Sequence, residues 1–270
     1  DGLSGQELVD YMKAQAERFG ARIKLFSAVT EVDFTSGRPF RLKTDDDQEY
    51  LADSVIVTVG ATPRHLNIPG EKELTGNGVS YCGTCDGFFF RDKEVVVVGG
   101  GDSALEEGIF LTKFANKVTV VHRRDELRAG ATLQQRAFAN EKIDFVWNSV
   151  VEEIGGNGAV QEVKLHNRVT GESQPFKTDG VFIFIGFNPN NQLVPAGTRM
   201  NADGMVVTNE KCETNSPGVF VIGDLREKFA RQIVLSAADG CTAALAAAHF
   251  VEAKKSVDPD ACEMPSNMAE

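Results

Sequence analysis

Two cysteines, Cys82 and Cys85, form a Cys-x-x-Cys pair shortly before a valine-rich segment that runs into a glycine-rich turn at residues 99–101. Such a pair can accept two electrons when its disulfide is reduced to two thiols. A nicotinamide bound at a glycine-rich turn can deliver two electrons as hydride. Each motif alone is weak evidence, but together they predict the nicotinamide-driven reduction of a disulfide.

The glycine-rich turn has the sequence context of a dinucleotide fingerprint. Gly99, Gly101 and Ala104 fit G-x-G-x-x-A directly after four valines and before a helix predicted to begin near Ser103. The first glycine permits a tight turn, the second lets the backbone approach a pyrophosphate, and the small third residue packs the helix on the strand. The helix N-terminus, with Asp102 and Ser103, would face the negative charge. An ordinary strand-to-helix turn is the alternative.

A basic segment follows the next predicted strand. It consists of His122, Arg123, Arg124 and Arg128. A site for NAD usually carries a carboxylate about 20 residues beyond the turn, whereas a guanidinium can hold a 2′-phosphate through two hydrogen bonds. The arginines therefore predict NADPH as the cofactor. In the alternative, Arg124 and Arg128 pair with Asp125 and Glu126 at a solvated helix start.

The cysteine pair is not expected to bind metal. A zinc site would need a second pair of ligands, and the four histidines are scattered along the chain. A thioredoxin-fold active site would cap a helix after a strand, whereas the residues here lead into a strand. Asp86, next to Cys85, is the nearest acid able to carry a proton as thiolates form. Its alternative role is simple turn formation with Gly87.

Reduction of a disulfide by a nicotinamide normally needs an intermediary, and a flavin can serve as one. Two segments that follow buried strands are candidates for holding it. One contains Gly223 and Asp224, and the other contains Thr58, Gly60 and Ala61. A structural turn would explain either segment equally well.

The order of predicted elements occurs twice, which indicates two similar α/β units, the second inserted in the first. The glycine-rich turn of the first unit would then fall before residue 1, so we expect an N-terminally truncated chain.

Composition narrows the class of protein further. A net charge of −11 argues against a nucleic-acid partner. No run of about 18 apolar residues predicts a membrane span. Five cysteines with one close pair favour a reducing compartment, the cytoplasm.

Over residues 1 to about 252, the sequence resembles the low-molecular-weight, bacterial-type thioredoxin reductases. The matching motifs are residues 82–89, 99–104, 122–124 with Arg128, and 223–224 with 231–233. The resemblance implies an α/β fold of two similar Rossmann-like, three-layer domains. An FAD domain, residues 1–65 and 188–253, would be interrupted by an NADPH domain, residues 66–187, that carries the dithiol. Residues 254–270 are expected to form a disordered tail.

The resemblance also implies a homodimer that passes electrons from NADPH through FAD and the dithiol to thioredoxin. In this reading Cys85 faces the flavin, Cys82 attacks the partner disulfide, and Asp86 is the general acid. The remaining cofactor residues fall into three groups. They are Gly99, Gly101 and Ala104 for the pyrophosphate; Arg123, Arg124 and Arg128 for the 2′-phosphate; and Asp224, Arg231, Gln232 and Ile233 for the flavin. Alternatives are a reductase of another protein disulfide, such as a peroxiredoxin, or a redox-inactive nucleotide-binding homologue.

Overall fold

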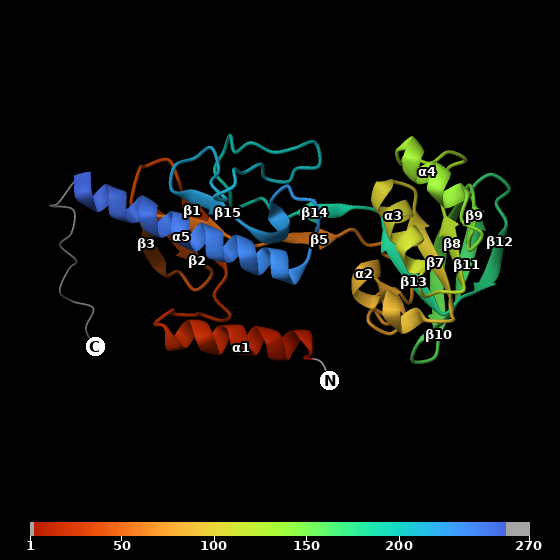
Figure 1. The fold of residues 1–270 in the computed structure, drawn as a ribbon. Helices are drawn as coiled ribbons and strands as arrows, with labels where there is room; N and C mark the ends of the chain where they lie inside the picture. The colour runs from red at the N-terminus through yellow and green to blue at the C-terminus, as the bar shows by residue number, and fades with distance from the viewer. Residues whose placement is uncertain (1–2, 258–270) are drawn as a thin grey trace. The chain divides into compact units, whose positions relative to one another are not determined.

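The computed structural model describes residues 3–257, and the chain divides into two compact units (Figure 1). The first unit comprises residues 1–60 and 189–270, and the inserted unit comprises residues 61–188. The two chain segments that connect the units pair with each other as short strands, β5 (Ala61–Pro63) and β14 (Phe187–Pro189). The inserted unit is therefore one continuous stretch of chain whose two ends lie together.

A five-stranded parallel sheet forms the centre of the inserted unit. Its strands, in spatial order, are β6 (Val79–Ser80), β13 (Gly180–Phe184), β7 (Glu94–Gly99), β8 (Lys117–Val121) and β9 (Ile143–Val146). Side chains alternate between the two faces of a strand, so the four valines of β7 serve both faces. Val95 and Val97 pack on one face, while Val96 and Val98 pack on the other. A strand covered on both faces needs such an uninterrupted apolar run.

Different elements cover the two faces of this sheet. The helices α3 (Asp102–Leu111) and α4 (Ala131–Phe138) pack on the face of Val95 and Val97, and contribute Leu105 and Ala137 to that core. The other face packs against an antiparallel sheet, which consists of β10 (Ser149–Gly156), β11 (Val160–Asn167) and β12 (Ser173–Lys177). The result is helices, parallel sheet and antiparallel sheet in three layers, which confirms the predicted fold class.

The part of the first unit that the structure describes contains two smaller sheets and two α-helices. It begins with α1 (Gly5–Arg18), where Ser4 and Glu7 form a reciprocal capping box. The strands are β1 (Val29–Asp33), β2 (Phe40–Thr44) and β3 (Glu49–Ala52) in an antiparallel sheet, and β4 (Val55–Val57) and β15 (Val219–Val221) in a parallel pair. A 3₁₀ turn, η2 (Gly223–Leu225), follows β15. Helix α5 (Ile233–Val257) contacts both strands of the parallel pair through an alanine-rich surface.

Helix α5 differs from the sequence expectation in two respects. Its segment Ile233–Ala253 has a mean hydropathy of 1.4 and is long and apolar enough to cross a membrane by those two criteria alone. The search for an uninterrupted apolar run missed it because small and polar residues interrupt the alanines; a helix that packs within a globular unit passes the same test. The helix also continues to Val257, so residues 254–257 of the expected disordered tail are helical. The rest of that tail lies outside the described residues.

Candidate functional site

The cysteine pair forms a disulfide in the inserted unit, the unit that also carries the glycine-rich turn. Cys82 is the N-cap of a four-residue helix, α2 (Gly83–Asp86), which continues into the 3₁₀ turn η1 (Gly87–Phe90). The Cys85 N–H donates to Cys82 Sγ at 3.2 Å, and the Asp86 N–H donates to the Cys82 carbonyl at 3.2 Å. The sequence predicted that this motif, unlike that of a thioredoxin fold, does not cap a helix. The structure differs, because Cys82 caps the short helix α2.

Ser80 connects the candidate acid to the disulfide. Its side chain is 5% exposed, and its hydroxyl donates to Asp86 Oδ2 at 2.6 Å. Ser80 Oγ also accepts a hydrogen bond from the Cys82 N–H at 3.1 Å. This serine therefore fixes the direction of the Asp86 carboxylate relative to the backbone of Cys82. Sequence reasoning missed Ser80 because a serine before a cysteine has no distinguishing signal.

An exposed aromatic surface follows the disulfide directly along the chain. Phe88 is 61% exposed and Phe89 is 70% exposed, although both are large apolar side chains. The Phe88 ring lies 6.2 Å from that of Phe114, and the Arg91 guanidinium lies over it at 5.3 Å. Large apolar side chains gathered at the surface are a feature of protein interaction sites. This part of the inserted unit suits contact with a protein rather than with solvent alone.

The glycine-rich turn has the shape that a pyrophosphate requires. Gly99 has φ +155°, and a Cβ there would lie 2.6 Å from the Phe184 carbonyl oxygen and 2.7 Å from Ala104 Cβ. Gly101 is the N-cap of α3 and makes no side-chain cap, and a Cβ on it would meet nothing nearer than Arg128 at 3.8 Å. The surface in front of Gly101 is thus open, and backbone N–H groups at the helix start face it. The residues present fit a bound dinucleotide.

His122 and Asp102 support the turn from the protein side. The His122 ring is 4% exposed and lies beneath Gly100, with Nδ1 3.0 Å from the Gly99 carbonyl and Nε2 3.0 Å from that of Glu126. Burial lowers the pKa of His122, although both carbonyl contacts oppose this. Asp102 Oδ1 accepts from the Gly130 N–H at 2.7 Å. The sequence analysis expected both residues at the cofactor. In the structure, their side chains contact the backbone of neighbouring segments at Gly99, Glu126 and Gly130.

The basic segment is exposed at Arg123, Arg124 and Arg128. Among the residues that the structure describes, no ion pair joins Arg124 or Arg128 to Asp125 or Glu126, which removes the support for the solvated helix start. A further arginine, Arg168, joins this segment by donating to the Arg123 carbonyl at 3.3 Å. Sequence reasoning missed Arg168 because it lies beyond β11, and only the tertiary fold brings it here.

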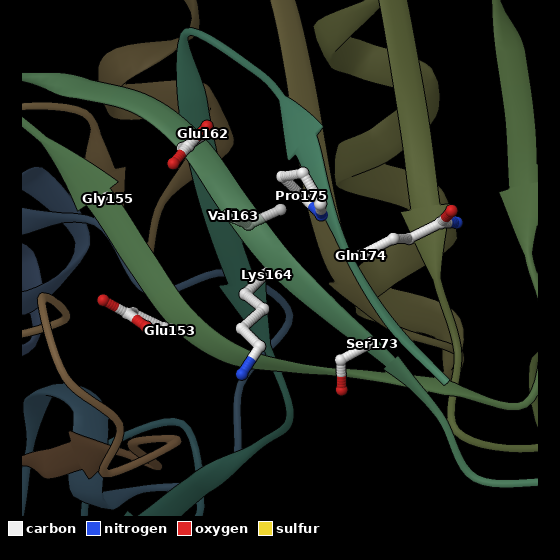
Figure 2. A pocket seen from close by; sticks show the side chains of 8 residues that line it. All are labelled: Glu153, Gly155, Glu162, Val163, Lys164, Ser173, Gln174 and Pro175. Atoms are coloured by element: carbon white, nitrogen blue, oxygen red, sulfur yellow. The ribbon is translucent and has the colours of Figure 1, made fainter. Parts of the chain in front are cut away.

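A separate pocket of about 160 Å³ lies on the antiparallel sheet of the inserted unit (Figure 2). Its lining includes the charged residues Glu153, Glu162 and Lys164. The pocket shares no residue with the disulfide, the glycine-rich turn or the basic segment. It therefore adds nothing to the candidate redox site.

In the first unit, the candidate flavin residues lie at tight turns after the parallel strands. Gly60 has φ +65° and Gly223 has φ +68°, conformations that glycine adopts without strain. One oxygen of Asp224, Oδ1, is buried without a hydrogen-bond partner among the described residues; Lys228 Nζ lies 3.4 Å from it as an ion pair. A buried carboxylate oxygen that has an ion-pair neighbour but no hydrogen bond can accept one from a hydroxyl-bearing ligand such as the ribityl chain of a flavin.

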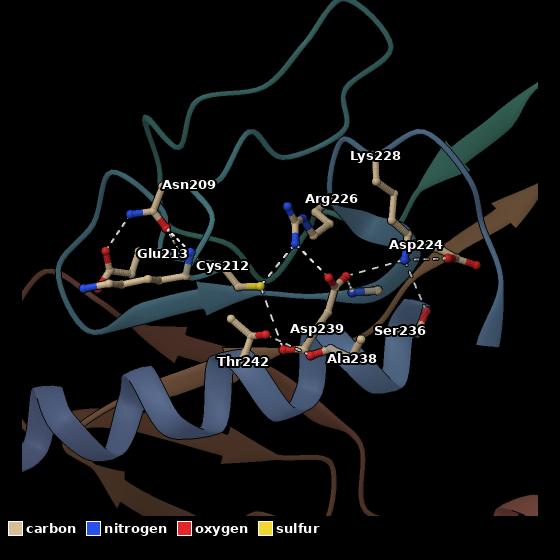
Figure 3. Close-up of polar contacts among 12 residues, drawn as sticks. Asn209, Cys212, Glu213, Asp224, Arg226, Lys228, Ser236, Ala238, Asp239 and Thr242 are labelled. Carbon is tan, nitrogen blue, oxygen red and sulfur yellow. Dashed lines mark hydrogen bonds and ion pairs between the residues drawn. The ribbon is translucent and has the colours of Figure 1, made fainter. Parts of the chain in front are cut away.

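The turn at Gly223 is anchored by Asp239 of α5 (Figure 3). Asp239 Oδ2 accepts from the Gly223 N–H at 3.0 Å, and Oδ1 lies 2.8 Å from Arg226 Nη1. Arg231, Gln232 and Ile233 lie at the start of the same helix, where Gln232 accepts from the N–H groups of two residues in its first turn. The predicted flavin residues of the C-terminal half thus belong to one anchored turn and helix start, and Asp239 is an additional member that sequence reasoning missed.

A redox disulfide and a dinucleotide-binding turn on one α/β unit define a nucleotide-linked disulfide oxidoreductase. Comparison with known proteins agrees. The sequence model of the pyridine nucleotide-disulphide oxidoreductases matches residues 3–247. A thioredoxin reductase of Bacillus subtilis is 49% identical over 253 residues, covering 93% of this chain and 79% of that protein. One of Peptoclostridium litorale is 47% identical over 255 residues, covering 92% of this chain and 80% of that protein.

A solved structure supports the same conclusion. The crystal structure of a thioredoxin reductase from Streptococcus pyogenes matches with a TM-score of 0.86 at 44% identity, over 93% of this chain and 81% of that one. The chain therefore belongs to the thioredoxin reductases within the pyridine nucleotide-disulphide oxidoreductases. It is an NADPH-dependent flavoprotein disulfide oxidoreductase whose cofactors are FAD and NADPH, as predicted.

The Gly101→Ala variant should separate folding from nucleotide binding. A Cβ at this position has free space in the protein itself, so the thermal unfolding midpoint should stay close to that of the wild type. The same methyl group would stand between the backbone and a pyrophosphate, so affinity for NADPH should fall about tenfold or more, or at least about 1.4 kcal/mol. Titration of the holoenzyme with NADP⁺ measures the loss. Unchanged affinity would place the pyrophosphate elsewhere.

Proposed function

We propose that the protein reduces the disulfide of thioredoxin, using NADPH, as a homodimer in the cytoplasm. The observation that carries the proposal is the Cys82–Cys85 disulfide, which precedes the exposed Phe88 and Phe89 on the unit that bears the nucleotide turn. A protein substrate needs an accessible surface beside the reactive sulfurs, and these two rings supply one. The relatives that the chain matches carry the name of this activity.

The proposal assigns the two cofactors to two domains whose predicted boundaries lie close to those of the two compact units. Residues 66–187 would bind NADPH and carry the dithiol, whereas residues 1–65 and 188–253 would bind FAD. A bound FAD would supply the two-electron chemistry that links the oxidation of NADPH to the reduction of a disulfide. The protein residues would then act on the sulfurs. Cys82 would attack the partner disulfide, Cys85 would resolve the resulting mixed disulfide, and Asp86, oriented by Ser80, would supply and remove the proton.

The remaining proposed contacts follow the geometry of each site. Gly99, Gly101 and Ala104, with the start of α3 at Asp102 and Ser103, would hold the NADPH pyrophosphate. The 2′-phosphate would lie at Arg123, Arg124 and Arg128, above the buried His122. The flavin would be held by residues at the turns and helix start of the first unit and by Ala61 at the adjoining start of β5. The residues of the first unit are Thr58, Gly60, Gly223, Asp224, Arg231, Gln232 and Ile233. A net charge of −11 supports the expectation that neither nucleic acid nor a membrane surface is a partner.

The proposal is tested with the purified full chain, FAD, NADPH and a bacterial thioredoxin in its oxidised form. NADPH consumption that depends on the thioredoxin, with two thiols formed for each NADPH, is the expected result. If the chain binds FAD and oxidises NADPH but reduces only an oxidised peroxiredoxin, then a peroxiredoxin is the substrate and thioredoxin is not. A chain that binds nucleotide without oxidising NADPH in either assay would be a redox-inactive homologue.

A further inference from the structure

We propose that Glu107 of α3 is a positioning residue that makes the Cys82–Cys85 dithiol more strongly reducing, by occupying a backbone donor at the start of α2. Glu107 Oε2 accepts from the Thr84 N–H at 3.0 Å, and the same carboxylate lies against the backbone of Gly83. A Cβ on Gly83 would overlap with Oε2, so the carboxylate packs directly against the backbone of the redox motif.

Three backbone N–H groups that follow Cys82 have acceptors. That of Thr84 donates to Glu107 Oε2, that of Cys85 donates to Cys82 Sγ, and that of Asp86 donates to the Cys82 carbonyl. N–H groups at the start of a helix normally stabilise a thiolate at its N-cap and lower the thiol pKa. Here the Glu107 carboxylate accepts the one from Thr84, so less of this stabilisation reaches the Cys82 sulfur.

The charge of Glu107 acts in the same direction as its hydrogen bonds. A carboxylate beside a thiolate disfavours the thiolate, because like charges repel. A dithiol whose reduced form is poorly stabilised gives up its electrons readily, whereas stabilisation of the reduced form makes a disulfide a strong oxidant. Burial raises the pKa of Glu107, while hydrogen bonding to the Thr84 N–H opposes this rise. Titratable groups in the described neighbourhood of the motif include Asp86 on α2, Glu106 on α3, and Tyr81 with its partner Glu71.

The equilibrium that reports this effect is the exchange with glutathione. The disulfide and two glutathione thiols give the Cys82–Cys85 dithiol and one glutathione disulfide, so two electrons and two protons are transferred in balance. The full-length holoenzyme, without NADPH, is equilibrated in glutathione redox buffers at pH 8.5, where thiolate forms. The fraction of reduced Cys82–Cys85 peptide is then measured by differential alkylation and mass spectrometry, so the other cysteines do not interfere.

In Glu107→Gln the equilibrium constant for reduction should rise about threefold to tenfold, since a change of one unit in a thiol pKa is worth up to tenfold. Tenfold corresponds to about 30 mV in potential. Glu107→Ala, which also frees the Thr84 N–H, should shift it at least as far. Glu106→Gln removes an exposed carboxylate from the neighbouring position of the same helix and is the matched control, expected to stay near the wild type.

A second route to the same effect is Gly83→Ala, whose methyl group displaces the Glu107 carboxylate without removing it. This variant should shift the equilibrium in the same direction by a smaller factor, and it tests the proposal even if the Glu107 variants fold poorly. A merely structural role would change thermal stability and leave the equilibrium constant unchanged. The proposal is overturned if Glu107→Gln and Gly83→Ala match the wild type, or if Glu106→Gln shifts the equilibrium as far. None of these outcomes depends on which protein disulfide the enzyme reduces.

Discussion

Cys82→Ser and Cys85→Ser should each abolish turnover with thioredoxin, yet they should fail at different steps. With Cys85 replaced, Cys82 remains able to attack a partner disulfide and no thiol is present to resolve the product. A stable mixed disulfide should therefore accumulate with a thioredoxin whose own resolving cysteine has been removed. With Cys82 replaced, Cys85 should still perturb the flavin absorbance as a thiolate but should trap no partner.

The measurement is a non-reducing gel for the adduct together with the flavin spectrum of each holoenzyme. Cys241→Ser is a suitable control, because Cys241 is an exposed free cysteine in the first unit. It should leave turnover and trapping unchanged. Equal trapping by the Cys82 and Cys85 variants would contradict the division of roles, since it would mean that either sulfur can reach the partner.

Replacing Arg123 and Arg124 with alanine should weaken the binding of NADPH far more than the binding of NADH. Each arginine would contribute a charge-assisted hydrogen bond to the 2′-phosphate, worth about 1.5 to 3 kcal/mol, or about 10- to 150-fold in affinity. NADH lacks that phosphate and should bind the double variant as it binds the wild type. The dissociation constants for both nucleotides, measured on the holoenzyme at one fixed ionic strength, test this directly.

Arg136→Ala is the matched control for this experiment. Arg136 is an exposed arginine in the last turn of α4, outside the basic segment, so its removal changes the net charge by the same amount per residue. It should leave the NADPH-to-NADH ratio unchanged. If the double variant weakened both nucleotides equally, the arginines would act by general attraction and the 2′-phosphate would bind elsewhere. Arg168→Ala should give a smaller loss, specific for NADPH, if Arg168 belongs to the same patch.

The sequence was sufficient for the features that depend on local pattern. The four valines before Gly99 require a strand buried on both faces, and the small residues after them allow only a close strand-to-helix turn. The cysteine spacing likewise predicted a redox pair, because scattered histidines left no metal site. These inferences rest on residues that are neighbours in the chain, where chain geometry limits the possible arrangements.

The residues that were missed are those that reach the site from distant parts of the chain. Glu107 lies in the middle of α3, a helix assigned to nucleotide binding, and only the packing of α2 on α3 brings it to the cysteine motif. Asp239 reaches Gly223 from α5, and Arg168 reaches Arg123 from the end of β11. The type of each residue is ordinary, so no single-sequence pattern distinguishes it from a solvated surface charge.

The pairing of β5 with β14 at the two connections has a consequence for the order in which the protein forms during synthesis. All strands of the five-stranded sheet and its covering layers lie between these two segments, so the inserted unit has its whole sequence available once β14 has left the ribosome. The parallel pair of the first unit is different, because Val55 must wait for Val219. Domains emerging from the ribosome fold as units when their chain is complete. The nascent chain should therefore hold a finished dithiol-bearing unit while the surrounding unit is still open.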